Sequence, residues 1–324
     1  MERREKRVEK RILIIGSLNM DLAIEMKRMP VAGETVLGMK LDYIPGGKGA
    51  NQACAAARLG GNVKMLGCIG ADEFGEVLKK NLMTCGVNVS NLKRSDRKST
   101  GIASIYVDGQ GNNTIVVVPG ANMECDVGYL REYDNVLQQS DYVILQMEIP
   151  QEAICYAVGR AKELGKTVIL NPAPAPDSLP DAIWEKLDYI TPNETELMKL
   201  SKKEGNCLGD FIEGAKVLLD KGVKNVLVTM GEKGALLVNE NLSEVFPARK
   251  VIPVDTTAAG DCFNGAFVVA LAEGKEEQEA VRFANTASSI AVTRNGAQTS
   301  IPDREETNRV LAEMDGWKGD ALFA

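Results

Sequence analysis

Short apolar runs alternate with segments of helical spacing along most of the chain. The apolar runs are bounded by glycine, proline or polar residues, which is typical of strands buried on both faces; they lie at 11–16, 63–69, 142–146, 167–170, 189–190 and 226–230. Apolar residues with helical spacing occupy 72–85, 151–164 and 276–292. This alternation predicts an α/β fold with a doubly wound, mostly parallel sheet flanked by helices.

Two β-rich runs interrupt the alternation. Residues 100–107 and 113–118 are joined by Asp108-Gly109-Gln110-Gly111, a sequence typical of a hairpin turn. Residues 34–44 alternate weakly, as a further strand would. We expect these segments to stand away from the main sheet as a small β lid, formed by about 21–45 and 100–120 and inserted in a single domain spanning 1–324.

Composition then narrows the class of protein. The chain has 324 residues, a formal charge of -7 and a pI of about 5.1, which argue against binding to nucleic acid or to an anionic membrane. The start lacks the apolar segment of a signal peptide, and no apolar run is long enough to span a membrane. Seven scattered cysteines without a Cys-x-x-Cys pair predict neither a disulfide framework nor a zinc site. We therefore expect a cytoplasmic protein with reduced cysteines and a small-molecule partner.

The absence of histidine has the largest consequence for chemistry. It excludes Ser-His-Asp and Cys-His catalysis as well as histidine-bound metals. Acid-base catalysis must therefore use Asp, Glu, Lys, Tyr or Cys.

Polar residues follow the first predicted strand at Asn19 and Asp21. In an extended backbone these two side chains point to the same face, and an amide beside a carboxylate suits the hydroxyl groups of a polyol; a turn capped by the two side chains is the alternative. The stretch from Gly46 to Asn51 reads GGKGAN and precedes an alanine-rich helix. Its glycines indicate either close approach of a ligand at a helix start or a simple tight turn, and Lys48 and Asn51 are candidates to bind the same ligand as Asn19 and Asp21.

The stretch 254–274, VDTTAAGDCFNGAFVVALAEG, is the strongest candidate for a catalytic segment. A strand-like start at 254–257 passes through Ala258-Ala259-Gly260 into a helix that begins near Asp261. The small residues allow an anion to approach the helix start, and the adjacent carboxylate could take a proton from a nucleophile. The alternative is that Asp261 caps the helix.

Two further candidates follow later strands. Glu148 comes after the strand at 142–146, at the carboxyl end where open α/β sheets bind ligands. Asn193 and Glu196 are three residues apart on a first helical turn, which suits either a hydrated Mg²⁺ with a phosphate or a capping box. Glycines flank the run after 226–230 and could frame a nucleotide or turn a corner.

Taken in order, these motifs resemble one family. They are NxD at 19–21, GGKGAN at 46–51, NPAPA and TPNETE at 171 and 191, DTTAAGDCFNGAF at 255–267 and TRNGAQTSIP at 293–302. Over nearly its full length the chain resembles the ribokinase family of carbohydrate kinases. The resemblance implies ATP-dependent phosphorylation of D-ribose at O5 to give ribose 5-phosphate, with Mg²⁺ and an activating monovalent cation, usually K⁺.

The resemblance also implies a role for each matching residue. Asp261 would be the base, and Ala258, Ala259 and Gly260 would form the anion hole. The sugar site would consist of Asn19, Asp21, Gly47, Lys48, Asn51 and Glu148. ATP would contact Asn193, Thr229, Gly231, Gly234, Gly260 and Asn285, and Glu196 would organise Mg²⁺ through water. The monovalent cation would lie among Asp255, Thr257, Ala291, Arg294, Gly296 and Ser300. Asn285 departs from the family pattern, in which a histidine often lies near the nucleobase.

Several alternatives remain open from the sequence. The substrate could be 2-deoxyribose, another sugar or a nucleoside, although the Asn19 and Asp21 pair favours vicinal hydroxyl groups. A sugar-binding regulator without catalysis is a second class, and a nicotinamide oxidoreductase is a third, disfavoured because Gly16 stands alone where Gly-x-Gly-x-x-Gly would follow the first strand. An exposed lid hairpin invites pairing with its copy, and the resemblance implies a homodimer through the lid.

Overall fold

The structure is a computed structural model and describes residues 10–316. Residues 1–9 of the charged leader lie outside the described residues. None of the helices between residues 10 and 316 is both long and apolar enough to cross a membrane.

An eight-stranded sheet forms the centre of the molecule, in the order β14-β13-β12-β11-β10-β9-β1-β4. Neighbours are parallel from β12 to β4, whereas β13 runs antiparallel to β12 and β14. This confirms the predicted mostly parallel sheet. The strands are β1 (Arg11–Ile15), β4 (Asn62–Leu66), β9 (Tyr142–Leu145), β10 (Thr167–Leu170), β11 (Tyr189–Ile190), β12 (Asn225–Thr229), β13 (Ala235–Asn239) and β14 (Ser243–Phe246).

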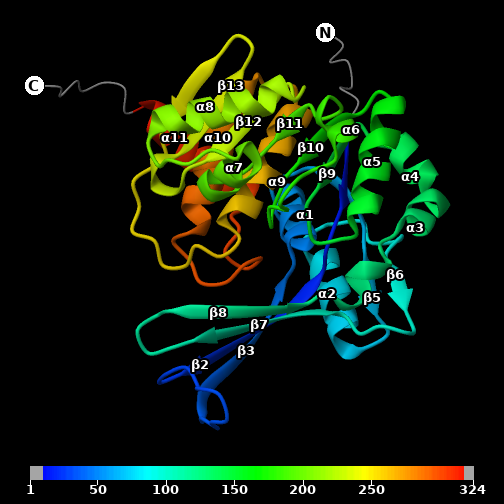
Figure 1. Cartoon of the computed structure of the whole chain (residues 1–324), viewed down its shortest axis with the longest axis vertical. Coiled ribbons are helices and arrows are strands. Elements are labelled where there is room, and N and C mark those ends of the chain that lie inside the picture. Colours follow the sequence, from blue (N-terminus) through cyan, green and yellow to red (C-terminus); the bar gives the residue numbers. More distant parts are fainter. Residues whose placement is uncertain (1–9, 317–324) are drawn as a thin grey trace, which may run out of the picture.

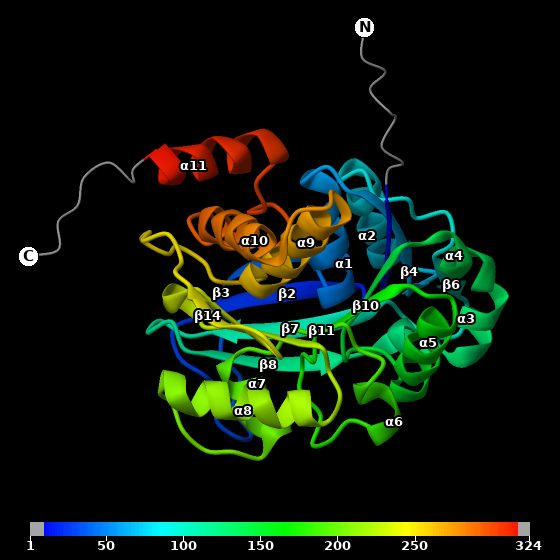
Figure 2. The ribbon, with the colours of Figure 1, turned by 90° about the horizontal axis from the view of Figure 1, so that it is seen from above.

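Helices cover both faces of this sheet, as Figure 2 shows. Because strand residues alternate in direction, Ile12 and Ile14 of β1 join one buried cluster and Leu13 and Ile15 join the other. On the first face lie α1 (Lys48–Arg58), α2 (Glu73–Thr84), α9 (Ala259–Ala272), α10 (Glu277–Ala291) and α11 (Arg304–Gly316). On the second lie α3 (Val127–Glu132), α4 (Asp134–Gln139), α5 (Gln151–Glu163), α6 (Asp181–Trp184), α7 (Glu194–Ser201) and α8 (Leu208–Asp220). The doubly wound architecture is therefore confirmed.

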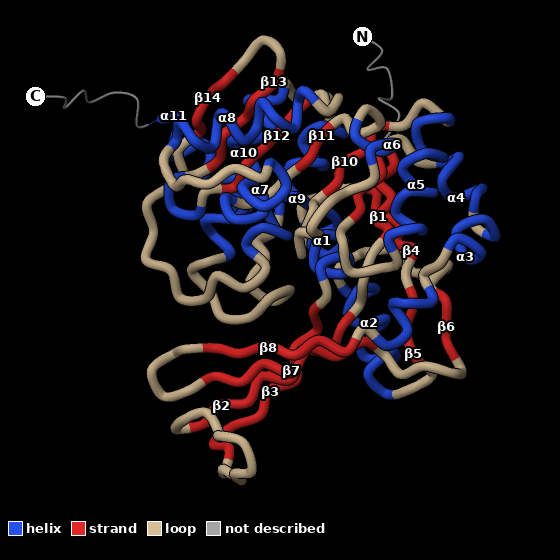
Figure 3. The backbone as a smooth tube through the Cα atoms, in the orientation of Figure 1, coloured by secondary structure: helices blue, strands red, loops and turns tan. Residues whose placement is uncertain are grey.

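A second sheet projects from the main body (Figures 1 and 3). Its strand order is β3-β2-β7-β8, and its strands are β2 (Asn19–Met26), β3 (Gly38–Gly46), β7 (Gly101–Val107) and β8 (Asn113–Val118). The Asp108 carboxylate closes the β7–β8 turn by accepting hydrogen bonds from the amides of Gln110 and Asn112. Two short strands, β5 (Cys68–Gly70) and β6 (Lys93–Ser95), pair separately.

Two strand expectations are wrong. The segment 254–257 is a loop, because the amides of Val254 and Asp255 donate to the carbonyl of Val292 at the end of α10 and not to a strand. The run at 63–69 is interrupted at Gly67, whose carbonyl accepts from Lys93 and Tyr129 instead of continuing the ladder of β4.

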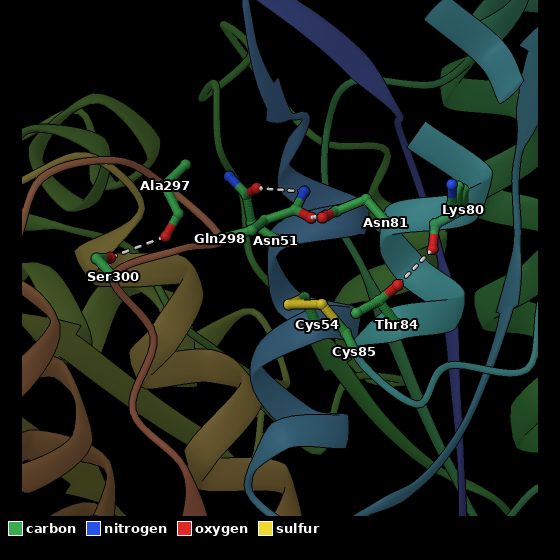
Figure 4. The surroundings of a disulfide bond; sticks show 9 residues. All are labelled: Asn51, Cys54, Lys80, Asn81, Thr84, Cys85, Ala297, Gln298 and Ser300. Carbon is green, nitrogen blue, oxygen red and sulfur yellow. Dashed lines mark hydrogen bonds between the residues drawn. A yellow bond between two sulfur atoms is a disulfide. The ribbon is translucent and has the colours of Figure 1, made fainter. Parts of the chain in front are cut away.

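The expectation that all cysteines are reduced is also wrong. Cys54 of α1 and Cys85, directly after α2, form a disulfide with a Cα–Cα distance of 5.3 Å (Figure 4). The remaining five are free thiols in this structure. The two cysteines are 31 residues apart in the sequence. Their spacing gave no indication of the pairing, because the pairing depends on how α1 and α2 pack against one another.

Candidate active site

A polar cavity of about 220 Å³ opens at the carboxyl ends of the central parallel strands. This is the edge at which open α/β sheets bind ligands. Its lining comes from the starts of α1, α7 and α9 and from the ends of the strands between them. The polar and small residues that line it are Lys48, Asn171, Ala173, Thr191, Asn193, Glu196, Thr229, Thr256, Ala258, Ala259, Gly260, Asp261 and Asn264.

Asp261 is the most enclosed carboxylate of this cavity. Its Oδ2 accepts a hydrogen bond of 2.9 Å from Nδ2 of Asn51, and its Oδ1 accepts one of 3.0 Å from Nε2 of Gln52. The N-cap of α9 is Ala258, and no side chain caps this helix. The alternative reading of Asp261 as a cap is therefore wrong: two amides of α1 hold its carboxylate and leave further lone pairs for a ligand.

Charge is concentrated around Lys48. Burial raises the pKa of Asp261, while Lys48, Asn51 and Gln52 act in the opposite direction. Burial alone would lower the pKa of Lys48, but four nearby carboxylates outweigh it and raise that pKa; they belong to Asp261, Glu148, Glu196 and Asp21. The ammonium group therefore stays protonated at neutral pH and is the counter-ion of the site.

The predicted sugar residues come together beside this lysine. Asn19 and Asp21 are buried on β2, and Oδ1 of Asn19 accepts a bond of 2.8 Å from Nδ2 of Asn122. Burial, followed by repulsion from Glu148 and Asp261, raises the pKa of Asp21 to about 7. The strand geometry rules out the alternative of a turn capped by Asn19 and Asp21.

Glycine is required next to this pair, and Glu148 holds the other side. A Cβ on Gly46 would lie 2.3 Å from Oδ2 of Asp21, and Gly47 has a φ of 89°, with a Cβ position 2.7 Å from the Asn19 amide. The Glu148 carboxylate accepts from Oγ of Ser17 at 2.5 Å and from the amide of Lys48 at 3.1 Å. The glycines thus allow α1 to begin directly against β2.

The start of α9 offers open backbone donors. Ala258 adopts a left-handed conformation with a φ of 58°, and the Ala259 amide donates to the carbonyl of Thr256 at 3.2 Å. The amides of Ala258, Gly260 and Asp261 have no acceptor among residues 10–316. Unpaired amides at a helix start attract anions, so the predicted anion hole has three free donors next to the Asp261 carboxylate.

The residues predicted to contact ATP divide into two groups. Asn193, Thr229 and Gly260 line the cavity, whereas Gly231, Gly234 and Asn285 lie outside its lining. Gly231 begins a 3-10 turn and Gly234 directly follows it, with φ values of 55° and 98°. Nδ2 of Asn285 donates to the carbonyl of Phe246 at 2.9 Å.

The capping box proposed as the alternative for Asn193 and Glu196 is present. Oδ1 of Asn193 accepts from the Glu196 amide at 2.8 Å, and Oε2 of Glu196 accepts from the Asn193 amide at 2.9 Å. Glu196 nevertheless borders the cavity, and burial raises its pKa. The capping bond occupies one of its carboxylate oxygens and leaves the other for a ligand.

The predicted cation residues belong to two loops joined by Asp255. Its Oδ1 accepts from the Thr257 amide at 2.8 Å and its Oδ2 from the Gly296 amide at 2.9 Å. Burial would raise the pKa of Asp255, but these hydrogen bonds outweigh it and lower that pKa. Ala291 ends α10, Arg294 forms an ion pair with Glu306, and Oγ of Ser300 donates to the carbonyl of Ala297. Among the described residues no cluster of three His, Cys, Asp or Glu side chains could hold a metal.

Sequence reasoning missed several amide side chains of the site. Gln52 and Gln298 are both buried and both hydrogen-bond to residues of the catalytic cluster. Gln52 directly follows GGKGAN, and Gln298 lies within TRNGAQTSIP, so their place inside the motifs was the available signal.

The comparisons with known proteins agree with this geometry. The family model described as pfkB family carbohydrate kinase matches residues 9–304. A ribokinase from Haemophilus influenzae is 39% identical over 94% of this chain and 99% of its own. A deoxyribokinase from Salmonella typhi is 35% identical over 93% of this chain and 98% of its own. The structure of Arabidopsis thaliana ribokinase complexed with ribose and ATP superposes with a TM-score of 0.87 at 32% identity, covering 94% of this chain and 98% of that one. The chain therefore belongs to the pfkB family of carbohydrate kinases.

Proposed function

We propose that this chain is an ATP-dependent ribokinase, which phosphorylates D-ribose at O5 to give ribose 5-phosphate. The observation that carries the proposal is the buried Asp261 carboxylate, held by two amides directly beside the open start of α9. The relatives named ribokinase and the Arabidopsis complex with ribose and ATP support the choice of substrates.

In the proposed mechanism Asp261 accepts the proton of the sugar's O5 hydroxyl as O5 attacks the γ-phosphorus of ATP. The new O5–P bond forms as the bond from the γ-phosphorus to the leaving oxygen of ADP breaks. The amides of Ala258, Gly260 and Asp261, at the turn that includes Ala259, stabilise the charge on the transferring group. Asn19, Asp21, Gly47, Lys48, Asn51 and Glu148 hold the sugar.

Sites for the nucleotide and for both cations form part of the same proposal. ATP would be held by Asn193, Thr229, Gly231, Gly234, Gly260 and Asn285. Glu196 has an oxygen available to a hydrated Mg²⁺, which prefers oxygen ligands and would neutralise phosphate charge. A monovalent cation such as K⁺ would lie between the loops that Asp255 joins, with Thr257, Ala291, Arg294, Gly296 and Ser300 around it.

We further propose one domain, with the second sheet as an inserted lid and as the contact of a homodimer. Both edge strands of that sheet carry exposed apolar side chains: Leu41 and Tyr43 on β3, and Ile115 and Val117 on β8. Unpaired edges of this kind favour association with a second copy. Sedimentation of the parent and of Ile115→Lys, with β8 as the altered edge, tests this contact.

A cytoplasmic location, where ATP is abundant, is part of the same proposal. Disulfides are rare in that compartment, so the Cys54–Cys85 pair provides the test. Alkylation of free thiols in intact cells, followed by mass spectrometry, reports whether this pair is oxidised where the enzyme works.

One assay separates the proposed function from its rivals. ATP consumption is measured with ribose, 2-deoxyribose, fructose and adenosine, with and without K⁺. We expect ribose to be preferred, because Asn19 and Asp21 suit vicinal hydroxyl groups; equal or better turnover of 2-deoxyribose would support the activity named for the Salmonella relative instead. Asp261→Asn should lose activity, and a variant as active as the parent would overturn the mechanism.

A further inference from the structure

A chain of hydrogen-bonded side-chain amides leads from α2 through α1 to the Asp261 carboxylate of α9. Nδ2 of Asn81 on α2 donates to Oε1 of Gln298 at 2.5 Å, and Nε2 of Gln298 donates to Oδ1 of Asn51 at 3.0 Å. Nδ2 of Asn51 then donates to Oδ2 of Asp261 at 2.9 Å. Figure 4 shows Asn81, Gln298 and Asn51 next to the Cys54–Cys85 disulfide.

The direction of this chain is uniform. Each side-chain amide has one donor end and one acceptor end, and here every donor end faces Asp261. Asn51 and Gln298 are 6% and 4% exposed, so water is a poor substitute for either partner. The orientation of Asn51 therefore depends on Gln298: as long as Gln298 donates to Oδ1 of Asn51, the Nδ2 end must point to the carboxylate.

The other oxygen of Asp261 is held in a similar way. Nε2 of Gln146 donates to Oε1 of Gln52 at 2.7 Å, and Nε2 of Gln52 donates to Oδ1 of Asp261 at 3.0 Å. Each carboxylate oxygen is thus bound by a side-chain amide, of Asn51 or of Gln52, whose donor end is set by a further glutamine, Gln298 or Gln146. Gln298 differs from Gln146 in its location, because it belongs to the 293–300 loop.

That loop connects the amide chain to Asp255. The loop is held by the Gly296 amide, which donates to Oδ2 of Asp255, and by Oγ of Ser300, which donates to the carbonyl of Ala297 next to Gln298. A shift of the loop would therefore move Gln298 relative to Asn51.

We propose that Gln298 is a positioning residue that acts through Asn51 on the Asp261 carboxylate and connects the 293–300 loop to it. The inference rests on the proposed function, because it takes Asp261 as the base. A merely structural role would require only that Gln298 keep hydrogen bonds to its two neighbours. The positioning role requires that it donate to one and accept from the other.

Gln298→Glu distinguishes these roles. The introduced carboxylate has nearly the same shape and still accepts from Asn81, but it cannot donate to Asn51. Asn51 can keep a bond to it only by turning its own amide, and this presents Oδ1 of Asn51 to Asp261. The number of contacts is preserved while the donor to the base is lost.

We expect Gln298→Glu to lower kcat by about tenfold or more, the effect of losing a hydrogen bond to a charged group, with the KM for ATP within about twofold of the parent. The acidic limb of the pH profile of kcat should move to higher pH, because the bond from Asn51 favours the ionised form of Asp261. Gln278→Glu, an exposed site on α10, adds the same charge elsewhere and should leave both unchanged.

A second variant changes Asn81, the residue of the hydrogen-bond chain farthest from Asp261. Asn81 is half-buried, so Asn81→Asp is tolerated more easily in folding, and it removes the donor to Oε1 of Gln298. The pH profile should move in the same direction by a smaller amount, because water reaches this position.

The outcomes separate the two proposals. If Asp261→Asn is inactive while Gln298→Glu and Asn81→Asp keep the parent's kcat and pH profile, the positioning role is wrong and the proposed function stands. If Asp261→Asn is as active as the parent, the proposed function itself fails. A lower kcat with an unmoved pH profile in both amide variants assigns Gln298 a structural role and also refutes the inference.

Discussion

The Asp21 carboxylate should destabilise the ligand-free fold at neutral and alkaline pH. Its pKa rises from 3.8 to about 7, first through burial and then through repulsion from Glu148 and Asp261. A raised folded-state pKa in an acid means that the folded state binds the proton more tightly than the unfolded state does, so stability falls as pH rises from about 4 to about 7. With about 1.36 kcal/mol per pKa unit, Asp21 costs the folded state about 4 kcal/mol at pH 8 and about 2 kcal/mol at pH 5.

Asp21→Asn removes this cost, and urea unfolding of the ligand-free protein measures the gain. We expect the variant to be more stable than the parent at both pH values, with a gain about 2–3 kcal/mol larger at pH 8 than at pH 5. Glu25→Gln, at an exposed position near the far end of the same strand, is the control and should change stability equally little at each pH. A gain from Asp21→Asn that is independent of pH, or a loss at pH 8, would refute the assignment of a destabilising charge.

Three further predictions address other parts of the molecule. Cys54→Ser should lower the free energy of unfolding by about 4 kcal/mol, the chain-entropy value for a crosslink spanning 31 residues, and the loss should match that of the parent in dithiothreitol; an equal loss from Cys155→Ser, at a free thiol, would contradict this. Gly46→Ala should raise the KM for ribose about tenfold or more with little change in the KM for ATP. The new Cβ would lie 2.3 Å from Oδ2 of Asp21 and would push this carboxylate away; an unchanged KM for ribose would remove Asp21 from the sugar site. Asp255→Ala should abolish activation by K⁺ and also lower the rate measured without it, since Asp255 joins the two loops and holds the loop that carries Gln298; retained activation would place the cation elsewhere.

Much of the fold could be predicted because its signals are local. The strand and helix periods around β1, β9, β10 and the β7–β8 hairpin are complete within a few residues of sequence. The exceptions are segments whose hydrogen bonds come from far away. Val254 is a residue type common in strands, but its amide donates to the carbonyl of Val292. The strand β14 is only four residues long and joins the edge of the sheet by pairing with β13.

The site divides in the same way. Asn19, Asp21, Lys48 and Asp261 stand in short motifs whose chemistry can be interpreted without coordinates. Gln298 could not be identified in this way, because its role is a contact with a residue 247 positions away. The alternatives at Asp261 and Asn193 were resolved by the same kind of information: a cap or a capping box is defined by which amide the side chain reaches.

The helices on the first face of the sheet come from two distant parts of the chain: α1 and α2 lie near its start, and α9 and α10 near its end. Asn51 of α1 and Asp261 of α9 are 210 residues apart, yet they meet above the same face of β1. While the polypeptide leaves the ribosome, Ile12 and Ile14 remain without α9 and α10 until more than three quarters of the chain has been made. Only α1 and α2 can cover this apolar face of the nascent sheet for most of translation. The part that α9 and α10 later bury stays open to solvent, and this interval is when the protein is most prone to aggregate and most dependent on chaperones.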